Sequence, residues 1–548
     1  MSGFRVFQLE RSPLWGIKAG YFSPKLNAAA RSVPGMRWEP KIKAHVGYLD
    51  AIEQLVDRLR GLGLNSDDAP KNTRKWSHNL PVSYEGAREY QKEGIDFLVN
   101  LAGSGALLGD EMGCGKSIQA VKAVRALRRK TVIVCPAHVR GVWERPHELD
   151  DEGGELAKWW PKAHVFAPYG TKPSKAPPSA DVTVIHYDIV HAWVDTLLEW
   201  ANGDLTVVLD EAQYLLNPTS RRSIACRELA HAARGRIALT GTPPTDRVRD
   251  LYNIVDTISP GRFGDFFPFA LRFCNAHKKD VTGPDKTTKT VWDFDGKSNL
   301  KELRQRLDWF TLRRTKREVL KELPVLQRQI VDVQVPSKNR ISMNARLVGD
   351  KRHMRLALDS AADGKQKHVL NLIKGHLEAG VRVVVGTYRR AVCERFADAL
   401  GQVAPTVFIH GGVPLTRRSK IIDRLRKIEG ACCLVANIDC ISTGIDLTFA
   451  SVAVVAELVW EPRDFVQFES RLHRFGQTEG VLVQYVIARG TGDELIMQAV
   501  INKLDSFLDL VETDSGDGFK EALQGEPDEG LSRLAAALKK MGTKKGKS

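Results

Sequence analysis

The fold of this chain is decided at Gly109-Asp110-Glu111-Met112-Gly113-Cys114-Gly115-Lys116-Ser117. A short apolar run, 106–108, precedes this stretch, and apolar residues at three-residue steps follow it. That order is typical of a strand, a glycine loop and a helix. Glycines let backbone N–H groups close around phosphate, and a helix N-terminus adds a favourable dipole. The stretch therefore predicts a phosphate-binding loop, with Lys116 on the β- and γ-phosphates and Ser117 on Mg²⁺.

One position departs from the strict phosphate-loop pattern G-x-x-x-x-G-K-[ST]. Asp110 stands where the first glycine of that pattern belongs, so that only Gly113-x-Gly115-Lys116-Ser117 fits. Taken alone, the stretch leaves a second interpretation open, in which a glycine-rich turn contains Gly-Lys-Ser by chance.

An acidic pair, Asp210 and Glu211, follows the apolar run Leu205–Leu209, which is typical of a buried parallel strand. In α/β folds, ligands bind at the carboxyl ends of such strands. We expect Asp210 to hold Mg²⁺ and Glu211 to orient and deprotonate an attacking water. Without Lys116, an ordinary strand end followed by a helix cap would explain the pair equally well.

A further short strand is predicted at 236–239, and it ends in Thr240-Gly241-Thr242-Pro243-Pro244. These five residues are either a plain turn or a hydroxyl-bearing loop that senses the γ-phosphate. The residues of this segment alone leave both interpretations open.

The second half of the chain contains a new series of apolar runs at 381–385, 432–435, 452–455 and 481–483. Helical stretches such as 390–400 and 415–428 separate them. Alternating strands and helices predict βαβ units and a parallel sheet. No second phosphate loop occurs in this half of the sequence, so we expect it to complete the site of the first half rather than to repeat it.

Arg471 and Arg474 lie three residues apart, so on a helix they would share a face. A solvated basic face is one explanation of this spacing. Given an ATP site in the other half, arginine fingers that stabilise the transferring phosphate are the better explanation.

The composition favours a polyanionic partner. The chain has 548 residues, 43% of them hydrophobic, and a formal net charge of +15. This length predicts several domains, and the charge suits nucleic acid. The eight cysteines show no paired metal spacing and are expected to be reduced thiols. Without a signal peptide or a long apolar stretch, we expect no membrane partner and a cytoplasmic protein, from a bacterial or phage source rather than a nucleus.

At this point the chain resembles the Snf2-type branch of superfamily 2 helicases and translocases, over about residues 83–500. The matching segments follow the family order, and one of them, 210–213, departs at Gln213, where histidine is usual. The segment 442–448 is a looser match, with departures at Thr443 and Asp446. The segments are 88–94, with Gln91 as the base-reading glutamine, 110–117, 134–137, 210–213, 239–243, 312–316, 410–412, 442–448 and 471–477.

The resemblance implies an α/β fold in which two RecA-like parallel-sheet domains form an ATP cleft. It implies ATP and Mg²⁺ as cofactors, with Mg²⁺ on Ser117 and Asp210, and three groups of residues. The catalytic group is Lys116, Asp210, Glu211, Arg471 and Arg474. The nucleotide-binding group is Arg88, Gln91, Gly113, Gly115, Lys116, Ser117, Gly444 and Asp446. The coupling group is Gln213, Thr240, Thr242 and Gln467.

Two further segments, 292–300 and 33–40, resemble the annealing-helicase (HARP-type) branch. The second would belong to a small N-terminal α+β module, where Ile52, Leu55, Leu59 and Leu62 mark a helix. We expect a substrate-recognition-like module at 1–65, a linker at 66–82 and the first RecA-like domain at 83–260. After these we expect a linker and insertion region at 261–350, which is lysine-rich at 276–290. The second RecA-like domain would then occupy 351–505, and an acidic linker with a basic tail would occupy 506–548.

The function expected from these features is ATP-driven tracking along duplex, forked or branched DNA by a monomer, mainly through backbone contacts, with remodelling or reannealing of forks and junctions. Two alternatives stay open. One is a strand-separating helicase in recombination or repair, and the other is a DNA-binding scaffold with a silent ATP site. The sequence names no protein partner.

Overall fold

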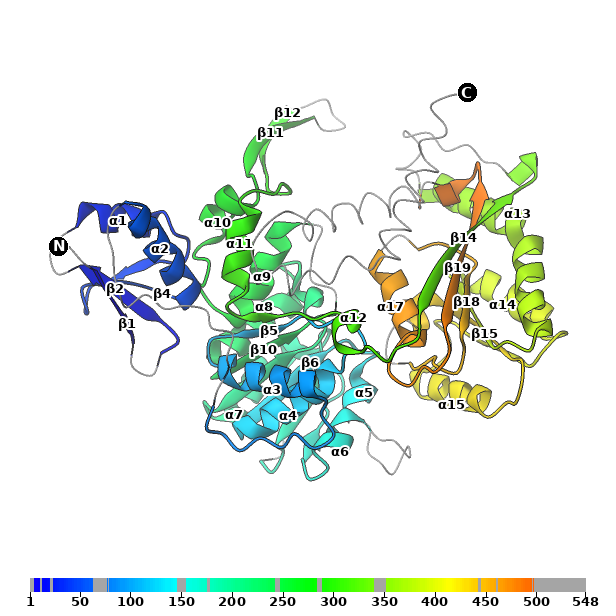
Figure 1. The fold of residues 1–548 in the computed structure, drawn as a ribbon, viewed down its shortest axis with the longest axis horizontal. Coiled ribbons are helices and arrows are strands. Elements are labelled where there is room, and N and C mark those ends of the chain that lie inside the picture. Colours follow the sequence, from blue (N-terminus) through cyan, green and yellow to red (C-terminus); the bar gives the residue numbers. More distant parts are fainter. Residues whose placement is uncertain are drawn as a thin grey trace. The chain divides into compact units, whose positions relative to one another are not determined.

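The structure is a computed structural model that describes residues 4–9, 12–19, 23–62, 76, 78–144, 154–174, 178–241, 247–282, 288–339, 351–441, 445–459, 462–494 and 496 (Figure 1). The chain divides into two compact units, one built mainly from residues up to Thr315 and the other mainly from residues after it. The predicted linker at 66–82 lies largely outside the described residues, and the tail at 506–548 lies entirely outside them.

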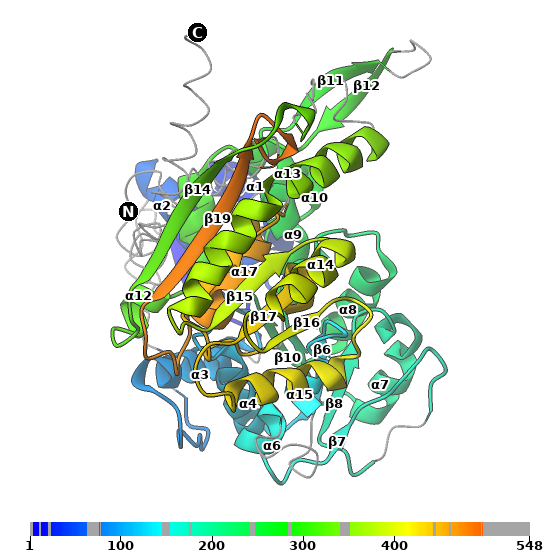
Figure 2. The ribbon, with the colours of Figure 1, turned by 90° about the vertical axis from the view of Figure 1, so that its right-hand side faces the viewer.

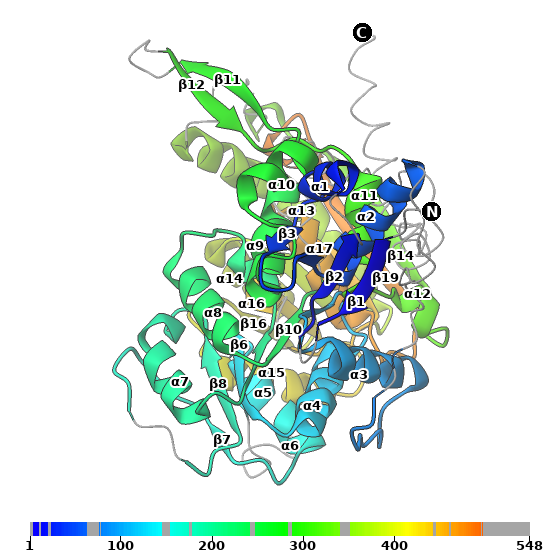
Figure 3. The ribbon, with the colours of Figure 1, turned by 90° about the vertical axis from the view of Figure 1, so that its left-hand side faces the viewer.

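The N-terminal module is an antiparallel sheet covered by two helices (Figure 3). Within the described residues the strand order is β1-β2-β4-β3. The predicted helix is confirmed as α2, whose residues Ile52, Leu55 and Leu59 are buried. The elements are β1 (Phe4–Gln8), β2 (Trp15–Ala19), α1 (Pro24–Arg31), β3 (Arg37–Glu39), β4 (Ala44–Gly47) and α2 (Leu49–Gly61).

The first unit contains a parallel sheet whose order, among the described residues, is β13-β5-β10-β9-β6-β8-β7. The strands predicted at 106–108, 205–209 and 236–239 are confirmed. Their bounds are β5 (Ala106–Leu108), β6 (Lys130–Cys135), β7 (Val165–Phe166), β8 (Val182–His186), β9 (Leu205–Leu209), β10 (Gly235–Leu239) and β13 (Thr311–Leu312). The helices are α3 (Glu89–Leu101), α4 (Lys116–Leu127), α5 (Arg140–Glu144), α6 (Glu155–Trp159), α7 (Val194–Ala201), α8 (Arg221–Ala232), α9 (Val248–Ile258), α10 (Phe266–Phe273) and α11 (Leu300–Leu307).

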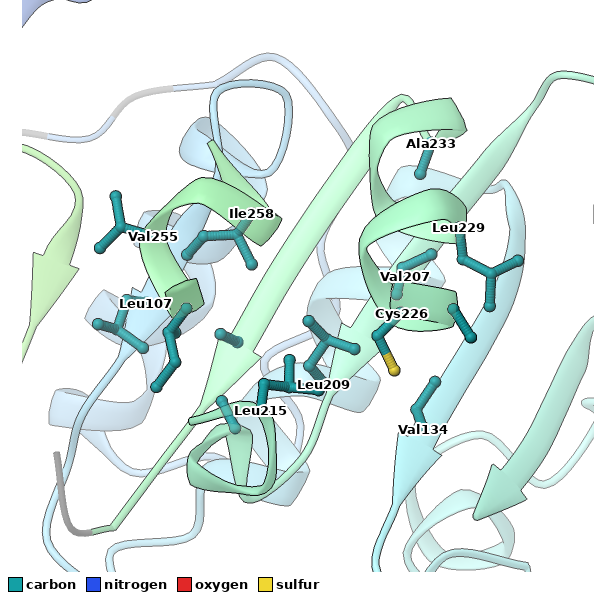
Figure 4. Close-up of a cluster of buried hydrophobic side chains, with 14 of the residues drawn as sticks. Leu107, Val134, Val207, Leu209, Leu215, Cys226, Leu229, Ala233, Val255 and Ile258 are labelled. Atoms are coloured by element: carbon teal, nitrogen blue, oxygen red, sulfur yellow. The ribbon is translucent and has the colours of Figure 1, made fainter. Parts of the chain in front are cut away.

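This sheet is buried on both faces, which explains why its strands are continuous apolar runs. In β9, Val207 and Leu209 point into a core shared with α8 and α9, where Leu229 packs (Figure 4). The intervening Val208 points into a second core, shared with α3 and α4. Both faces of β9 are therefore apolar, and the first polar side chains of this segment come where the strand ends.

Strand β13 extends the sheet from a segment that the sequence places in the linker region. Leu107 N–H donates to Phe310 O at 2.8 Å, and Gly109 N–H donates to Leu312 O at 2.7 Å. Strand β13, near the end of the first unit, thus lies alongside β5, the strand that precedes the phosphate loop. The domain limits given above stay predictions.

The lysine-rich segment at 276–290 contains most of an antiparallel hairpin. Strand β11 (His277–Thr282) pairs with β12 (Thr288–Asp293), with Lys278 opposite Trp292. Because alternating β-branched and polar residues favour a strand over an irregular loop, the hairpin has a local explanation that composition alone did not give.

The N-terminal module is joined to the rest of the first unit by a buried ion-pair cluster. Asp50 of α2 accepts hydrogen bonds from Arg262 Nη1 at 2.7 Å and from Arg306 Nε at 2.8 Å. The Asp50 and Arg306 side chains are fully buried, and that of Arg262 is 3% exposed. Removing one partner of such a cluster would leave buried charge without compensation, so these contacts fix the module in place.

The second unit contains another parallel sheet, with the order β14-β19-β18-β15-β17-β16 in the part of the chain that is described (Figure 2). Its strands are β14 (Leu326–Gln334), β15 (Val383–Thr387), β16 (Thr406–Ile409), β17 (Cys433–Asn437), β18 (Val452–Val455) and β19 (Val481–Arg489). Its helices are α12 (Lys316–Val319), α13 (Lys351–Glu378), α14 (Arg390–Leu400), α15 (Leu415–Arg426), α16 (Ile438–Ile441) and α17 (Pro462–Leu472). The predicted fold class, two RecA-like parallel-sheet domains with a small N-terminal α+β module, is confirmed.

Candidate nucleotide site

The predicted phosphate loop connects β5 to α4, as the sequence indicated. Gly113 and Gly115 have φ values of 89° and 73°, in the left-handed region that favours glycine. Gly115 is also the N-cap of α4, so that Lys116 and Ser117 occupy its first turn. A helix N-terminus that follows glycines in this conformation is suited to bind phosphate.

The Lys116 side chain points back over its own loop. Its ammonium donates to Asp110 O at 2.8 Å and to Glu111 O at 3.4 Å. Two backbone carbonyls therefore hold the positive charge beside the loop, where an anion would meet it.

Asp110, the departure from the strict pattern, belongs to a buried ion pair. It is fully buried, and Arg314 donates to its Oδ1 at 3.1 Å and to its Oδ2 at 2.6 Å. Gln119 of α4 donates to Asp110 Oδ2 at 3.2 Å and accepts from Arg314 Nη2 at 2.9 Å. The aspartate thus connects the start of the loop to the helix that follows it and to the chain after β13.

Gln91, the predicted base-reading residue, lies next to this loop. Its side-chain oxygen accepts from the backbone N–H of Arg88, the N-cap of α3, at 2.9 Å. A Cβ added at Gly115 would come within 2.4 Å of Gln91 Nε2. The structure therefore brings Gln91, Arg88 and the phosphate loop together, and a side chain at residue 115 would both strain the backbone, whose φ is 73°, and displace the Gln91 amide.

Asp210 occupies the carboxyl end of β9 and is almost fully buried. Its Oδ2 accepts from the indole N–H of Trp143 at 2.8 Å, and its Oδ1 accepts from the N–H of Glu211 at 3.0 Å. The hydroxyl of Tyr187 donates to Asp210 O at 2.8 Å. Both carboxylate oxygens thus have a donor that fixes the plane of the group.

The pKa of Asp210 is raised to about 7. Burial is the main cause, because it penalises the charged form, and the neighbouring charge of Glu211 adds to it. The Trp143 hydrogen bond and the positive charge of Lys116 act in the opposite direction. A buried carboxylate in this state would be stabilised in its charged form by a cation.

Glu211, Gln213 and Thr240 form a chain of hydrogen bonds. Glu211 has a φ of 50°, which is uncommon for a residue with a side chain. Its Oε2 accepts from Gln213 Nε2 at 2.6 Å, and Gln213 Oε1 accepts from the buried hydroxyl of Thr240 at 3.0 Å. The chain links the ends of β9 and β10, and the coupling role of Gln213 and Thr240 stays a prediction.

The two arginines of the second unit do not share a helix. Helix α17 ends at Leu472, so Arg471 is in its last turn and Arg474 lies beyond it. The expectation of a common helical face is wrong, because the chain turns away before Gly476, whose φ is 97°. Arg474 is half-buried, and its Nε has no hydrogen-bond partner among the described residues.

The other predicted residues of the second unit form local contacts. Gln467 is buried in α17, and its carbonyl accepts from the Ser470 hydroxyl at 2.8 Å. Asp446 forms an ion pair with Arg426 at 3.2 Å and accepts from Thr448 N–H at 2.9 Å. Thr242 and Gly444 lie outside the described residues.

Three residues that the structure places at the site had no role assigned from the sequence. These are Trp143 and Tyr187, which contact Asp210, and Arg314, which contacts Asp110. Arg314 belongs to a segment that matched the family, but the match did not say what the side chain touches. For Trp143, a lone tryptophan after the segment 134–137 was the one available hint.

Comparisons with known proteins identify the family of this chain. Residues 90–380 match the SNF2-related domain, and residues 364–476 match the helicase conserved C-terminal domain. The chain is 28% identical over 435 residues to the Xenopus tropicalis SWI/SNF-related matrix-associated actin-dependent regulator of chromatin subfamily A-like protein 1, covering 76% of this chain and 44% of that protein. It is 29% identical over 464 residues to the mouse DNA annealing helicase and endonuclease ZRANB3, covering 80% and 42% respectively.

Among solved structures, the Sulfolobus solfataricus SWI2/SNF2 ATPase core in complex with dsDNA is 22% identical, with a TM-score of 0.38 over 83% of this chain and 99% of that one. The chain spans about two fifths of the length of the two relatives named above. Both are animal proteins, so the expected bacterial or phage source gains no support from them. Helices long and apolar enough to cross a membrane are absent from the described part of the chain. The match to the SNF2-related domain covers more than half of the residues of this chain. The chain therefore belongs to the SNF2-related family of helicase-like ATPases, whose ATPase domains bind nucleotide.

Proposed function

We propose that this protein is a DNA-dependent ATPase that tracks along duplex or branched DNA. One observation carries the proposal: a buried carboxylate, Asp210, lies at the end of β9 within the electrostatic reach of Lys116 of the phosphate loop. This pairing, in a chain of the SNF2-related family, supports ATP hydrolysis over a DNA-binding scaffold with a silent site.

The residues at the site fit Mg²⁺. Asp210 and Ser117 offer a carboxylate and a hydroxyl, which are the hard oxygen ligands that Mg²⁺ prefers. Asp210 is buried beside Glu211, and a divalent cation there would stabilise its charged form. Bound there with ATP, the ion would neutralise charge on the β- and γ-phosphates.

The residues of the chain then have separate roles. Lys116 binds phosphate, Glu211 orients and deprotonates the attacking water, and Gln91 and Arg88 receive the base. The hydrogen-bond chain from Glu211 through Gln213 to Thr240 supports a coupling role, because a shift at either end would move the other. We assign Arg471 and Arg474 to stabilise the charge of the transferring phosphate.

DNA is the proposed partner, and the protein is proposed to act on it as a monomer. The net charge of +15 favours contacts to phosphate, so we expect little sequence preference and strong salt dependence. A relative bears the name DNA annealing helicase and endonuclease, which favours forks and junctions as the DNA shapes on which this protein works. Reannealing rather than strand separation is then the proposed outcome of tracking.

The test compares ATP turnover without DNA and with single-stranded, duplex, forked and four-way DNA. We expect stimulation by duplex and branched DNA, and loss of turnover in Lys116→Ala with DNA binding mostly retained. Displacement of a triplex-forming strand without duplex unwinding would distinguish tracking from strand separation. Turnover that ignores every DNA, or that persists at the wild-type level in Lys116→Ala, would reject the proposal.

A further inference from the structure

The indole of Trp143 binds the carboxylate that is proposed to hold Mg²⁺. Trp143 is completely buried in helix α5, and its N–H donates to Asp210 Oδ2 at 2.8 Å. Hydrogen bonds to a charged acceptor are stronger than those between neutral groups, and a buried one is not weakened by competing water. This contact therefore has energetic consequences beyond those of the packed ring.

Packing alone does not explain why the N–H points at Asp210. A phenyl ring would fill apolar space around residue 143 without any polar contact. The other oxygen, Oδ1, already accepts from the N–H of Glu211 at 3.0 Å. With one donor on each oxygen, the carboxylate has a single preferred orientation, whereas the Glu211 bond alone would leave it able to rotate.

Helix α5 itself is held to the segment 167–169 through Arg140. Arg140 forms an ion pair with Glu144 at 2.8 Å and donates to the carbonyls of Pro168 and Ala167 at 2.9 and 2.6 Å. Its guanidinium lies 3.6 Å from the ring centre of Tyr169. The indole is thus attached to a helix that cannot shift independently of the segment 167–169.

A short turn, residues 136–139, joins the end of β6 to this helix. Val139 N–H donates to Pro136 O, and Val142 N–H donates to Val139 O, both at 2.9 Å. Asp210 N–H also donates to Val134 O at 2.8 Å. The segment 134–137 is therefore joined to Asp210 both through the backbone and through the indole.

We propose that Trp143 is a positioning residue that orients Asp210 for Mg²⁺, and that α5 transmits displacements of the segment 134–137 to the Mg²⁺ site. This inference rests on the proposed function, because it assumes that Asp210 binds the ion. A partner of this kind in the outer shell of a metal site typically changes metal affinity by 10–100-fold.

The test uses two replacements that remove the N–H. Trp143→Phe keeps an aromatic ring, and β-(3-benzothienyl)alanine at residue 143 keeps the full bicyclic volume with sulfur in place of the N–H. Trp309→Phe is the matched control, because the Trp309 indole also donates to a carboxylate, Glu53 Oε2 at 2.5 Å, in the same unit but at the N-terminal module. Thermal unfolding identifies any variant that does not fold.

Binding of a fluorescent ATP analogue is measured first in EDTA and then over a Mg²⁺ titration. For the residue 143 variants we expect wild-type affinity in EDTA and a half-maximal Mg²⁺ concentration that is about 10-fold higher or more. We also expect a smaller stimulation of turnover by DNA at saturating Mg²⁺. The Trp309→Phe control should match the wild type in all three measurements.

The outcomes separate this inference from the proposed function. A wild-type protein whose nucleotide binding ignores Mg²⁺ would reject the proposed Mg²⁺ site and this inference together. A wild type that responds to Mg²⁺, beside a folded residue 143 variant with the same Mg²⁺ dependence, would reject only the role of Trp143. The benzothienyl variant decides the matter if Trp143→Phe does not fold.

Discussion

Arg314 donates to both carboxylate oxygens of Asp110, at 3.1 and 2.6 Å, although 204 residues separate the two in the sequence. The carbonyl of the same Asp110 accepts from the ammonium of Lys116 at 2.8 Å. The last residues of the first unit therefore support the loop that is proposed to bind phosphate.

Asp110→Asn should weaken this support. The substitution keeps the size of the side chain but removes the buried carboxylate that pairs with Arg314, which also forms an ion pair with the exposed Glu93. Breaking a buried pair typically costs about 3–5 kcal/mol. We expect a lower temperature of unfolding and, because the loop loses its anchor, a higher KM for ATP. Differential scanning calorimetry and steady-state ATPase measure the two effects. Unchanged stability would show that the pair contributes no more than an exposed one.

Glu211→Gln should allow ATP to bind but prevent its hydrolysis. The amide has the size of the carboxylate and no basic oxygen, so general-base catalysis, typically worth 10²–10⁴-fold, would be lost. ATP affinity should change by no more than a few-fold, because Lys116 and Asp210 are untouched. Nucleotide affinity and turnover are measured separately. Weakened binding with a normal rate for the bound fraction would contradict the assigned role.

Arg474→Ala should reduce turnover far more than it weakens ATP binding. Arginine fingers act on charge that develops in the transition state and are worth about 10³–10⁵ in rate. The matched control is Arg395→Ala, because Arg395 lies in the same unit and pairs with Asp363 where both side chains are exposed. Turnover at saturating DNA is compared with equilibrium nucleotide binding. A change of only a few-fold would indicate that Arg474 belongs to a solvated basic face.

Asp50→Asn should destabilise the first unit, because Arg262 and Arg306 would stay buried with a weaker partner. We expect a loss of about 3–5 kcal/mol in the free energy of unfolding. Asp57→Asn is the control from the same helix, because its ion pair with Arg60 is exposed.

Deletion of residues 1–65 would remove Asp50 and so leave Arg262 and Arg306 without this partner. An exposed substitution in the module, Trp38→Ala, is therefore the cleaner test of the predicted role of the module in recognising the DNA substrate.

The cysteine thiols should resist alkylation while the protein is folded. Burial raises the pKa of Cys393 to about 11 and that of Cys274 to about 12. The thiolate is the reactive form, so at pH 8 about one Cys393 side chain in a thousand would be reactive. Both pKa values are higher in the folded than in the unfolded protein. The protonated thiols therefore contribute fully to the free energy of unfolding below about pH 8.5, and this contribution is lost as the pH rises toward 11–12. Mass spectrometry after iodoacetamide treatment, with and without urea, measures the protection. Equal labelling in both conditions would contradict it.

The parts of the site that were predictable from the sequence are those set by local patterns. The run 205–209 had to be a buried strand, so its end fixed the position of Asp210. The glycines before Lys116 likewise implied a loop and a helix start. The place of Gln91 beside the phosphate loop was expected only from the family resemblance, because nothing local connects the two segments.

The remaining contacts depend on tertiary packing. The partner of Asp110 comes from residue 314, and that of Asp210 comes from residue 143, and no periodicity relates these positions. The prediction that Arg474 shares a helical face with Arg471 was wrong for a different reason. A spacing of three residues indicates a shared face only while the helix continues, and α17 ends at Leu472. The role of that arginine stays a prediction.

The place of β13 in the first sheet has a consequence during synthesis of the protein. On the ribosome, β5 at 106–108 is complete about 200 residues before β13 at 311–312. At typical rates of translation, this interval lasts roughly 10–40 s. Throughout it, the N–H groups of Leu107 and Gly109 form an open sheet edge on the nascent chain, which invites pairing with other chains. The first half of this protein is therefore a natural client for chaperones until residue 312 has emerged.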